Sequence, residues 1–179
     1  MVKDTSKVFL GKGTIKTGLF LATTAIVVVL DQVSKSWVRA NLPQIELLPG
    51  FLDFIYVENY GSAFGLFANQ TFLIVIVVIA TILIVLLFFR YLSPSPTLSI
   101  VSISLILGGA LGNLIDRLRF GYVTDFIDIH LYEIFHWFTF NIADAAITIG
   151  IITLIYSLYR SGLFSKAYEH KGKTRDEDA

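Results

Sequence analysis

The stretch Gly121–Gly150, GYVTDFIDIHLYEIFHWFTFNIADAAITIG, contains the acidic residues around which the rest of the chain is interpreted. It places Asp125 and Asp128 on a short extramembrane segment. It places Asp144 about two turns inside a long apolar run that starts near Trp137. A carboxylate at the centre of a membrane helix costs about 2.5–3.5 kcal/mol on insertion scales, so such an acid is a functional candidate by default. Acids that meet at a membrane edge predict one chemistry above others, namely activation of water between paired carboxylates.

The composition predicts an integral membrane protein with one domain. The chain has 179 residues, of which 55% are hydrophobic and 16% charged, whereas soluble domains carry about 25% charged residues. The net charge is zero and no basic stripe occurs, which argues against nucleic acid as a partner. The absence of cysteine excludes disulfides, thiolate metal sites and a cysteine nucleophile.

Apolar runs predict four transmembrane helices, at residues 17–38, 71–89, 97–115 and 138–159. The first run follows a Lys-rich segment, residues 1–16. No small-x-small cleavage site follows this run, so we interpret it as an uncleaved span rather than a signal peptide. Gly108 and Gly112 lie four residues apart in the third run, which predicts a close approach of two helices. Residues 17–160 are thus expected to form the membrane domain, and the charged tail 161–179 is expected to be solvated.

Two segments, residues 39–70 and 116–137, are expected to lie outside the membrane. The Pro, Gly, β-branched and aromatic content of residues 41–69 favours short strands or hairpins over helix. Within them, Asn59 with Gly61 indicates a turn that shapes the backbone. Lys and Arg gather near both termini, which predicts cytoplasmic termini and extracytoplasmic segments, although Arg117 and Arg119 oppose this bias.

Asp144 would share one face of a helix with Asn141 and Thr148, so that face is expected to point into a polar cavity. The alternative is a structural carboxylate paired with an arginine such as Arg117. A buried acid is costly, and an amide lies one turn away, so the functional interpretation is favoured.

Asp125 and Asp128 both remain open as the second acid, because composition does not choose between them. Two neighbouring carboxyl groups do not ionise together easily, so the pKa of one rises and the pair shares a proton. The ionised partner then takes a proton from water while the protonated partner donates to a carbonyl oxygen. No covalent enzyme adduct is needed.

Other hydrolytic chemistries lack their motifs. The chain has no G-x-S-x-G element and no H-E-x-x-H element. His130 and His136 lie six apart and lack a third metal ligand by spacing, so both are interpreted as interfacial polar residues. What remains is a site made of acids, with no metal and no cofactor.

Five sequence blocks then carry a resemblance. They read DQVSK (31–35), ENYGSAFG (58–65), GGALGNLIDR (108–117), VTDFID (123–128) and FNIADAAI (140–147). In this order they resemble the motif blocks of bacterial lipoprotein signal peptidase, also called signal peptidase II. They cover the chain from about residue 31 to 150, and the Lys-rich start and the charged tail lie outside them.

The resemblance implies an aspartic endopeptidase of the bacterial cytoplasmic (inner) membrane. It would remove the signal peptide from prolipoproteins that carry a diacylglyceryl group, cutting before the lipidated lipobox Cys. The implied catalytic dyad is Asp125 with Asp144, which favours Asp125 over Asp128. The family fold is four transmembrane helices with a small extracytoplasmic β-cradle and a short interfacial helix. The implied enzyme is a multi-pass monomer that contacts membrane lipid and has its active site on the extracytoplasmic side.

The resemblance also implies supporting residues. Positions that line or brace the family's substrate site are matched by Asn59, Gly61, Gly109, Asn113, Arg117, Asn141 and Ala143. Positions linked to its architecture are matched by Asp31, Lys35 and Asp116. The competing interpretation is a small transporter or lipid-binding membrane protein with Asp144 as a proton-relay carboxylate. The apolar second run disfavours it, and a purely structural subunit would give the acids no reason to coexist.

Overall fold

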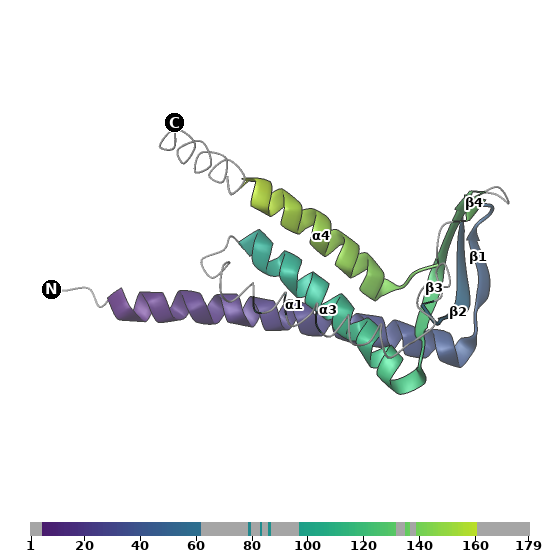
Figure 1. Cartoon of the computed structure of the whole chain (residues 1–179), viewed down its shortest axis with the longest axis horizontal. Helices are drawn as coiled ribbons and strands as arrows, with labels where there is room; N and C mark the ends of the chain where they lie inside the picture. The colour runs from purple at the N-terminus through teal and green to yellow at the C-terminus, as the bar shows by residue number, and fades with distance from the viewer. Residues whose placement is uncertain are drawn as a thin grey trace, which may run out of the picture.

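The computed structural model describes residues 5–61, 79, 83, 86, 97–131, 135–136 and 139–160. Figure 1 shows a helical part with a small sheet at one end, opposite the start of α1 and the end of α4. The bounded elements, in chain order, are α1 (Thr5–Asn41), β1 (Gln44–Leu48), β2 (Leu52–Asn59), α3 (Thr97–Phe120), β3 (Val123–Leu131), β4 (Phe135–His136) and α4 (Ile142–Arg160).

In the described part, three helical segments are long and apolar enough to cross a membrane: Ile15–Asn41, Thr97–Phe120 and Ile142–Arg160. They confirm three of the predicted spans. The predicted span 71–89 lies outside the described residues, except that residues 79, 83 and 86 are helical. Large apolar side chains are exposed along these helices, as expected where lipid is the solvent. They include Leu21, Ile26, Val29, Val33, Ile149, Ile152 and Ile155.

The helix bounds differ from the predicted spans. α3 continues to Phe120, beyond the predicted end at residue 115, and α4 begins at Ile142 rather than at residue 138. Hydropathy marks where a run stops being apolar, not where the backbone stops being helical. Asn113 and Asp116 stay helical because both are buried against polar partners on other elements.

Glycines on α3 let it pack closely against both α1 and α4 (Figure 1). A Cβ on Gly108 would lie 2.7 Å from Val27 Cβ of α1, and one on Gly112 would lie 2.5 Å from Asp31 Oδ2. Gly109 faces the α4 backbone instead. The predicted close approach at Gly108 and Gly112 is therefore confirmed, with α1 as the neighbour, and Gly109 allows a second close approach, to α4.

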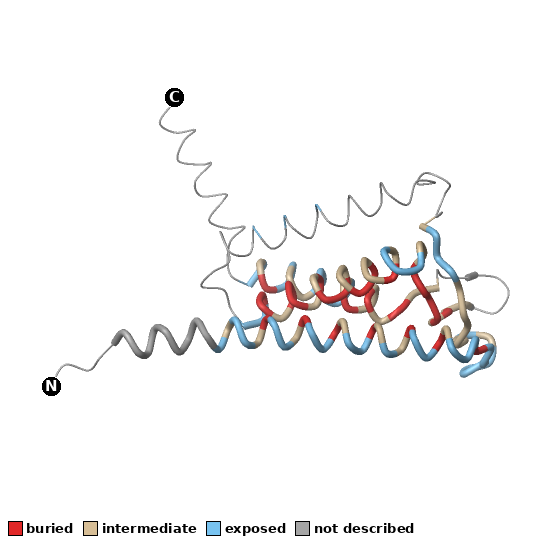
Figure 2. The backbone as a smooth tube through the Cα atoms, turned by 90° about the horizontal axis from the view of Figure 1, so that it is seen from below, coloured by how far each residue is buried: buried red, intermediate tan, exposed pale blue. Residues whose placement is uncertain are grey.

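The buried residues of the helices face one another (Figure 2). They include polar as well as apolar side chains. Ser99 and Ser157 share a hydrogen bond of 2.7 Å between α3 and α4, and Ser102 donates to Thr153 at 2.8 Å. Small hydroxyl residues are suited to this role, because they allow close backbones and satisfy each other across the seam.

The sheet is antiparallel throughout and has the order β1-β2-β3-β4. β1 and β2 confirm that residues 41–69 contain short strands. The prediction that residues 118–137 form a loop is wrong in part, because β3 occupies Val123–Leu131 and pairs along β2. Its two acids, Asp125 and Asp128, are three residues apart and so lie on opposite faces of the strand. The described residues contain no short interfacial helix.

Candidate active site

Asp144 belongs to a reciprocal cap at the start of α4. Asp144 N–H donates to Asn141 Oδ1 at 3.0 Å, and Asn141 N–H donates to Asp144 Oδ2 at 3.3 Å. This is the geometry of a capping box, in which the residue before the helix and the third helical residue satisfy each other. A carboxylate in the first turn also interacts favourably with the helix dipole.

The sequence-based placement of Asp144 two turns inside an apolar helix is therefore wrong. The residues before it are apolar, but Phe140 pairs with β3: its N–H donates to Ile127 O at 3.0 Å. The insertion cost assigned to a mid-membrane carboxylate does not apply at a capped helix terminus. Asp144 remains a candidate because of its neighbours rather than because of its depth.

Asp125 lies on β3 and is 1% exposed, so it is not a solvated loop acid. Its Oδ1 accepts the Asn141 side-chain amide at 2.6 Å, and its Oδ2 accepts the Asn59 amide at 2.8 Å. Asn141 thus contacts both acids, through its side chain to Asp125 and through its backbone to Asp144. The fold brings these two predicted catalytic residues together from a strand and a helix.

Burial raises the pKa of Asp125 to about 6, and the negative charge of Asp144 acts in the same direction. The amides of Asn59 and Asn141 and the charge of Lys35 oppose that rise. An acid with such a pKa exchanges its proton near physiological pH, which suits a group that must hold and release one.

Asn113 connects the acids to a buried lysine. Its Nδ2 donates to Asp144 Oδ1 at 2.7 Å. Its Oδ1 accepts Lys35 Nζ at 2.8 Å and Asn141 Nδ2 at 3.2 Å. The amide orientation is thereby fixed, since a lysine can only donate.

The predicted architectural residues form one buried ion cluster. Lys35 Nζ lies 2.9 Å from Asp31 Oδ2 and 3.4 Å from Asp116 Oδ2, and all three side chains are fully buried. Asp31 Oδ1 accepts the N–H of Ala143 at 3.0 Å, and Asp116 Oδ2 accepts that of Thr124 at 3.0 Å. The cluster therefore fixes the two segments that carry Asp144 and Asp125.

The remaining predicted residues surround this centre. Gly61 adopts a φ of 76°, which favours glycine, and its N–H donates to Asn59 Oδ1 at 2.8 Å. Gly109 lies against the backbone of Ala143. Arg117 donates to the Asn113 carbonyl at 3.4 Å and lies within electrostatic range of both acids. No ion pair joins Arg117 to Asp144 in the described part of the chain.

Asp128 points away from this site. It lies three residues after Asp125 on the same strand, and an odd separation places the two side chains on opposite faces. Its partners among the described residues are Thr139, whose Oγ1 donates at 3.3 Å, and His130, whose Nδ1 lies 3.5 Å from Asp128 Oδ2.

Sequence reasoning missed two members of the network on α1. Gln32 donates to Asp116 Oδ1 at 3.1 Å, and Arg39 lies 3.4 Å from the same carboxylate. Arg39 also donates to Thr124 Oγ1 at 2.8 Å. The spacing contained a sign of this, because Asp31, Lys35 and Arg39 repeat every four residues along one helix face.

Comparison with known proteins agrees with this arrangement. The family model for signal peptidase (SPase) II matches residues 23–160. Lipoprotein signal peptidase from Moorella thermoacetica is 46% identical over 142 residues, covering 78% of this chain and 91% of that protein. The enzyme from Syntrophotalea carbinolica is 40% identical over 155 residues, covering 83% and 96% respectively.

A solved bacterial membrane enzyme, determined at 1.9 Å resolution, superposes with a TM-score of 0.68 at 36% identity. The match covers 79% of this chain and 92% of that one. The resemblance drawn from the sequence blocks is thus confirmed over most of the chain, from the first membrane-capable helix to the last. The chain belongs to the signal peptidase II family of membrane peptidases.

Proposed function

We propose that this protein removes the signal peptide from diacylglyceryl-modified prolipoproteins, cutting before the lipidated Cys with water activated by Asp125 and Asp144. One observation carries the proposal: Asn141 contacts a buried strand carboxyl and a helix-terminal carboxyl at once. The relatives named lipoprotein signal peptidase support the substrate class.

In the proposed mechanism Asp125 is the protonated partner and Asp144 the ionised one. The raised pKa of Asp125 favours its neutral form. Asp144 accepts hydrogen bonds from Asn113 Nδ2 and from the Asn141 N–H at the start of a helix, and these donors stabilise a negative charge.

Asp144 takes a proton from water, and the water oxygen attacks the scissile carbonyl carbon. Asp125 donates its proton to the carbonyl oxygen as charge develops there. In the tetrahedral intermediate that results, the proton on Asp144 passes to the leaving nitrogen and the C–N bond breaks. Asp125 recovers its proton as the new carboxyl group forms. Proton transfer by each positioned acid contributes about 10²–10⁴-fold to the rate.

The position of the acids suits a lipid-anchored substrate. Asp125 lies on β3 and Asp144 in the first turn of the membrane-capable helix α4. Figure 1 shows the sheet at this end of the helices. A diacylglyceryl anchor would confine the scissile bond to that depth, and binding of the acyl chains would orient the peptide.

Both termini are proposed to be cytoplasmic and the site extracytoplasmic, in a monomer with a fourth helix over residues 71–89. Residues 1–16 and 161–179 are proposed to lie outside this membrane domain. Membrane lipid is the proposed surrounding partner, and no nucleic acid partner is proposed.

The test is cleavage of a diacylglyceryl-modified prolipoprotein by purified protein in detergent. Wild type should cut before the lipidated Cys and leave the same peptide with an unmodified Cys intact. Asp125→Asn and Asp144→Asn should each lose at least about 10²-fold in rate. Asp128→Asn is the matched control, since it removes an acid three residues along the same strand, and it should retain substantial activity. Cleavage by a folded Asp125→Asn variant, or a folded but inactive Asp128→Asn variant, would overturn the choice of dyad.

A further inference from the structure

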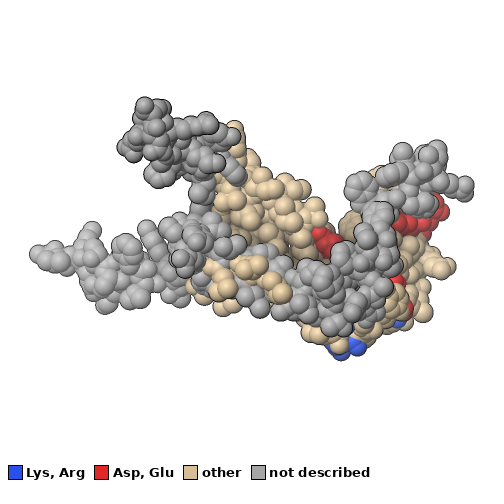
Figure 3. Space-filling model, viewed as in Figure 1, with Lys and Arg blue, Asp and Glu red and all other residues tan. Residues whose placement is uncertain are grey.

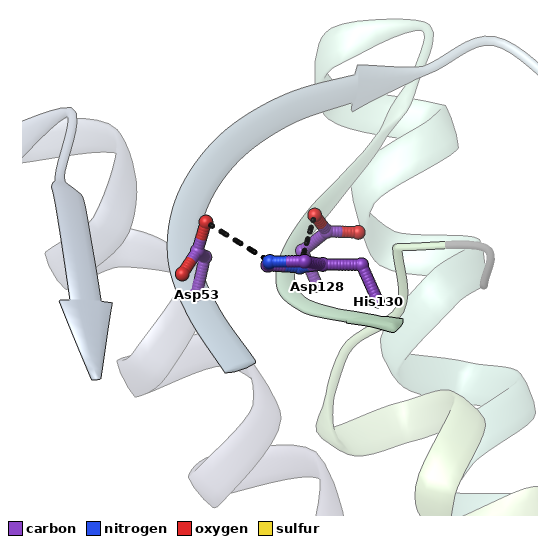
Figure 4. Close-up of side chains that lie close together, drawn as sticks. All are labelled: Asp53, Asp128 and His130. Atoms are coloured by element: carbon purple, nitrogen blue, oxygen red, sulfur yellow. Dashed lines mark ion pairs between the residues drawn. The ribbon is translucent and has the colours of Figure 1, made fainter. Parts of the chain in front are cut away.

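Asp53, Asp128 and His130 form a second group of ionisable side chains on the sheet (Figure 4). The register places Asp53 of β2 directly opposite Asp128 of β3. His130 lies two residues after Asp128, so it shares that face of the strand. His130 Nε2 lies 4.0 Å from Asp53 Oδ2, and His130 Nδ1 lies 3.5 Å from Asp128 Oδ2.

The two acids lie on opposite sides of the His130 ring. Like charges directly opposite on neighbouring strands destabilise a sheet. The register extends the row to Glu46 of β1, which lies opposite Asp53. In the part of the chain that the structure describes, no Lys or Arg forms an ion pair with Asp53 or Asp128. On the face drawn in Figure 3, acidic side chains gather toward the sheet end of the molecule.

Asp53 also has an unsatisfied oxygen. Its Oδ1 atom is buried, and no hydrogen-bond donor of the described residues reaches it. A buried carboxylate oxygen without a partner is costly, so a water molecule or a bound cation is needed to satisfy it. Asp53 also lines an open cavity of about 570 Å³, so solvent reaches this member of the cluster.

We propose that Asp53, Asp128 and His130 bind a divalent transition-metal cation of the Zn²⁺ type. Two carboxylate oxygens and one imidazole nitrogen form a donor set that suits zinc better than calcium or magnesium, which prefer oxygen alone. The three candidate ligand atoms lie within 4.8 Å of one another. Bonds of about 2.0–2.2 Å to zinc require ligand atoms about 3.3–3.6 Å apart, so small side-chain rotations would close the site and leave a fourth position for water.

The proposed ion would be structural. β3 carries Asp125 three residues before Asp128, and β2 carries Asn59 six residues after Asp53. The ion would clamp the two strands next to the irregularity that shifts their register between Phe54 and Val57. It would thereby hold the Asn59 amide against Asp125 without taking part in peptide cleavage.

Spacing along the sequence left His130 without a third ligand, because the ligands come from different strands. The proposal would give His130 a ligand role in addition to that of an interfacial polar residue. It stands independently of the proposed peptidase mechanism, which uses neither Asp53 nor His130.

The test is zinc binding by full-length protein without a polyhistidine tag. The protein is treated with a chelator in detergent, freed of the chelator and titrated with ZnCl₂ by calorimetry and by thermal unfolding. Wild type should bind one equivalent and unfold at a higher temperature with zinc. Asp53→Asn, Asp128→Asn and His130→Gln should each weaken binding at least about tenfold. The matched control is Glu46→Gln, which removes a charge from the same row but no proposed ligand, and it should bind within about threefold of wild type.

Absence of zinc binding at millimolar concentration, or equal binding by wild type and the three ligand variants, would overturn the proposal. Three separate variants keep the test decisive if one of them fails to fold. Cleavage measured on the same chelator-treated wild type separates this proposal from the peptidase mechanism. A structural ion leaves cleavage within about threefold, whereas loss of cleavage that zinc restores would contradict a mechanism based on acids alone.

Discussion

Asn141 donates its side-chain amide to Asp125 Oδ1 at 2.6 Å, so the residue that caps α4 also holds the buried acid of β3. The same residue exchanges backbone and side-chain hydrogen bonds with Asp144. The cap brings the two carboxyl groups close together. Its geometry fixes Asp144, and the side-chain amide of Asn141 donates to Asp125. Asn141 is thus the residue that directly contacts both members of the proposed dyad.

Two replacements of Asn141 distinguish its role as the cap of α4 from its role as the contact between Asp125 and Asp144. Asn141→Ala removes both roles and should cost about 1 kcal/mol of stability together with about 10²-fold in cleavage rate. Asn141→Ser keeps a good N-cap but loses the amide that reaches Asp125, so it should unfold like wild type and still cleave slowly. The measurements are cleavage rate and thermal unfolding in detergent. Wild-type cleavage by Asn141→Ser would show that the bridge is dispensable.

The pH dependence of cleavage should follow the protonation of Asp125. Burial raises the pKa of Asp125 to about 6, and the proposed mechanism needs the protonated form. The value of kcat/KM should therefore be retained below that pKa and fall about tenfold per pH unit above the macroscopic pKa of the coupled pair. A rate that climbs steadily from pH 6 to 8 would contradict the assignment of Asp125 as donor.

A variant of Asn59 tests whether the pKa of Asp125 sets the alkaline limb of this profile. Its amide lowers the pKa of Asp125 by stabilising the carboxylate. Asn59→Ala should therefore raise that pKa and move the alkaline limb of the kcat/KM profile to higher pH. A limb that stays in place or moves to lower pH would mean that Asp125 does not control it.

The residues of the site were more predictable than their surroundings. The sequence blocks named Asp125, Asp144 and Asn141, and the structure brings these three together. Long apolar runs also predicted the helices, because a span must bury its backbone polar groups internally. Site residues that belong to short sequence motifs can be recognised from the sequence alone. The same is true of helices whose length is set by the thickness of a bilayer.

The local backbone around the acids could not be predicted in the same way. The aromatic residues before Asn141 are as apolar as a helix requires, yet Phe140 pairs with β3 because Ile127 offers it backbone partners. Asp125 was expected on an extramembrane loop, whereas it lies on β3, which pairs with the distant strand β2. Contacts between strands, such as Asp53 with His130, leave no trace in sequence spacing.

Lys35 should be essential for stability. Its charge lies between Asp31 and Asp116, at 2.9 and 3.4 Å, and no part of these side chains is exposed. Lys35→Met would leave the buried Asp31 carboxylate without its cation and Asp116 with Arg39 alone. Breaking such a buried pair costs about 3–5 kcal/mol. Thermal unfolding in detergent measures the loss. Lys16→Met on the same helix is the matched control and should change stability by less than about 0.5 kcal/mol. Equal stability of the two variants would contradict a structural role for the cluster.

Gly112 tests how far helix packing controls the proposed dyad. An added Cβ would lie 2.5 Å from Asp31 Oδ2 and 3.4 Å from Ala143 Cβ, so α1 or α4 must shift. Asp31 holds the N–H of Ala143 in the first turn of α4, and a shift there displaces Asp144. Gly112→Ala should therefore cost about 1–3 kcal/mol in stability and lower the cleavage rate of the folded fraction.

Gly18→Ala is the control for Gly112→Ala, because a Cβ at Gly18 meets nothing within 4 Å. On an exposed helix position alanine is favoured over glycine by about 1 kcal/mol, so this variant should be neutral or more stable, with unchanged cleavage. The two variants make the same chemical change on different helices. If both lose stability equally, the loss does not come from the contact with Asp31. If Gly112→Ala loses stability but cleaves normally once folded, α4 tolerates the shift and Asp144 does not depend on this packing.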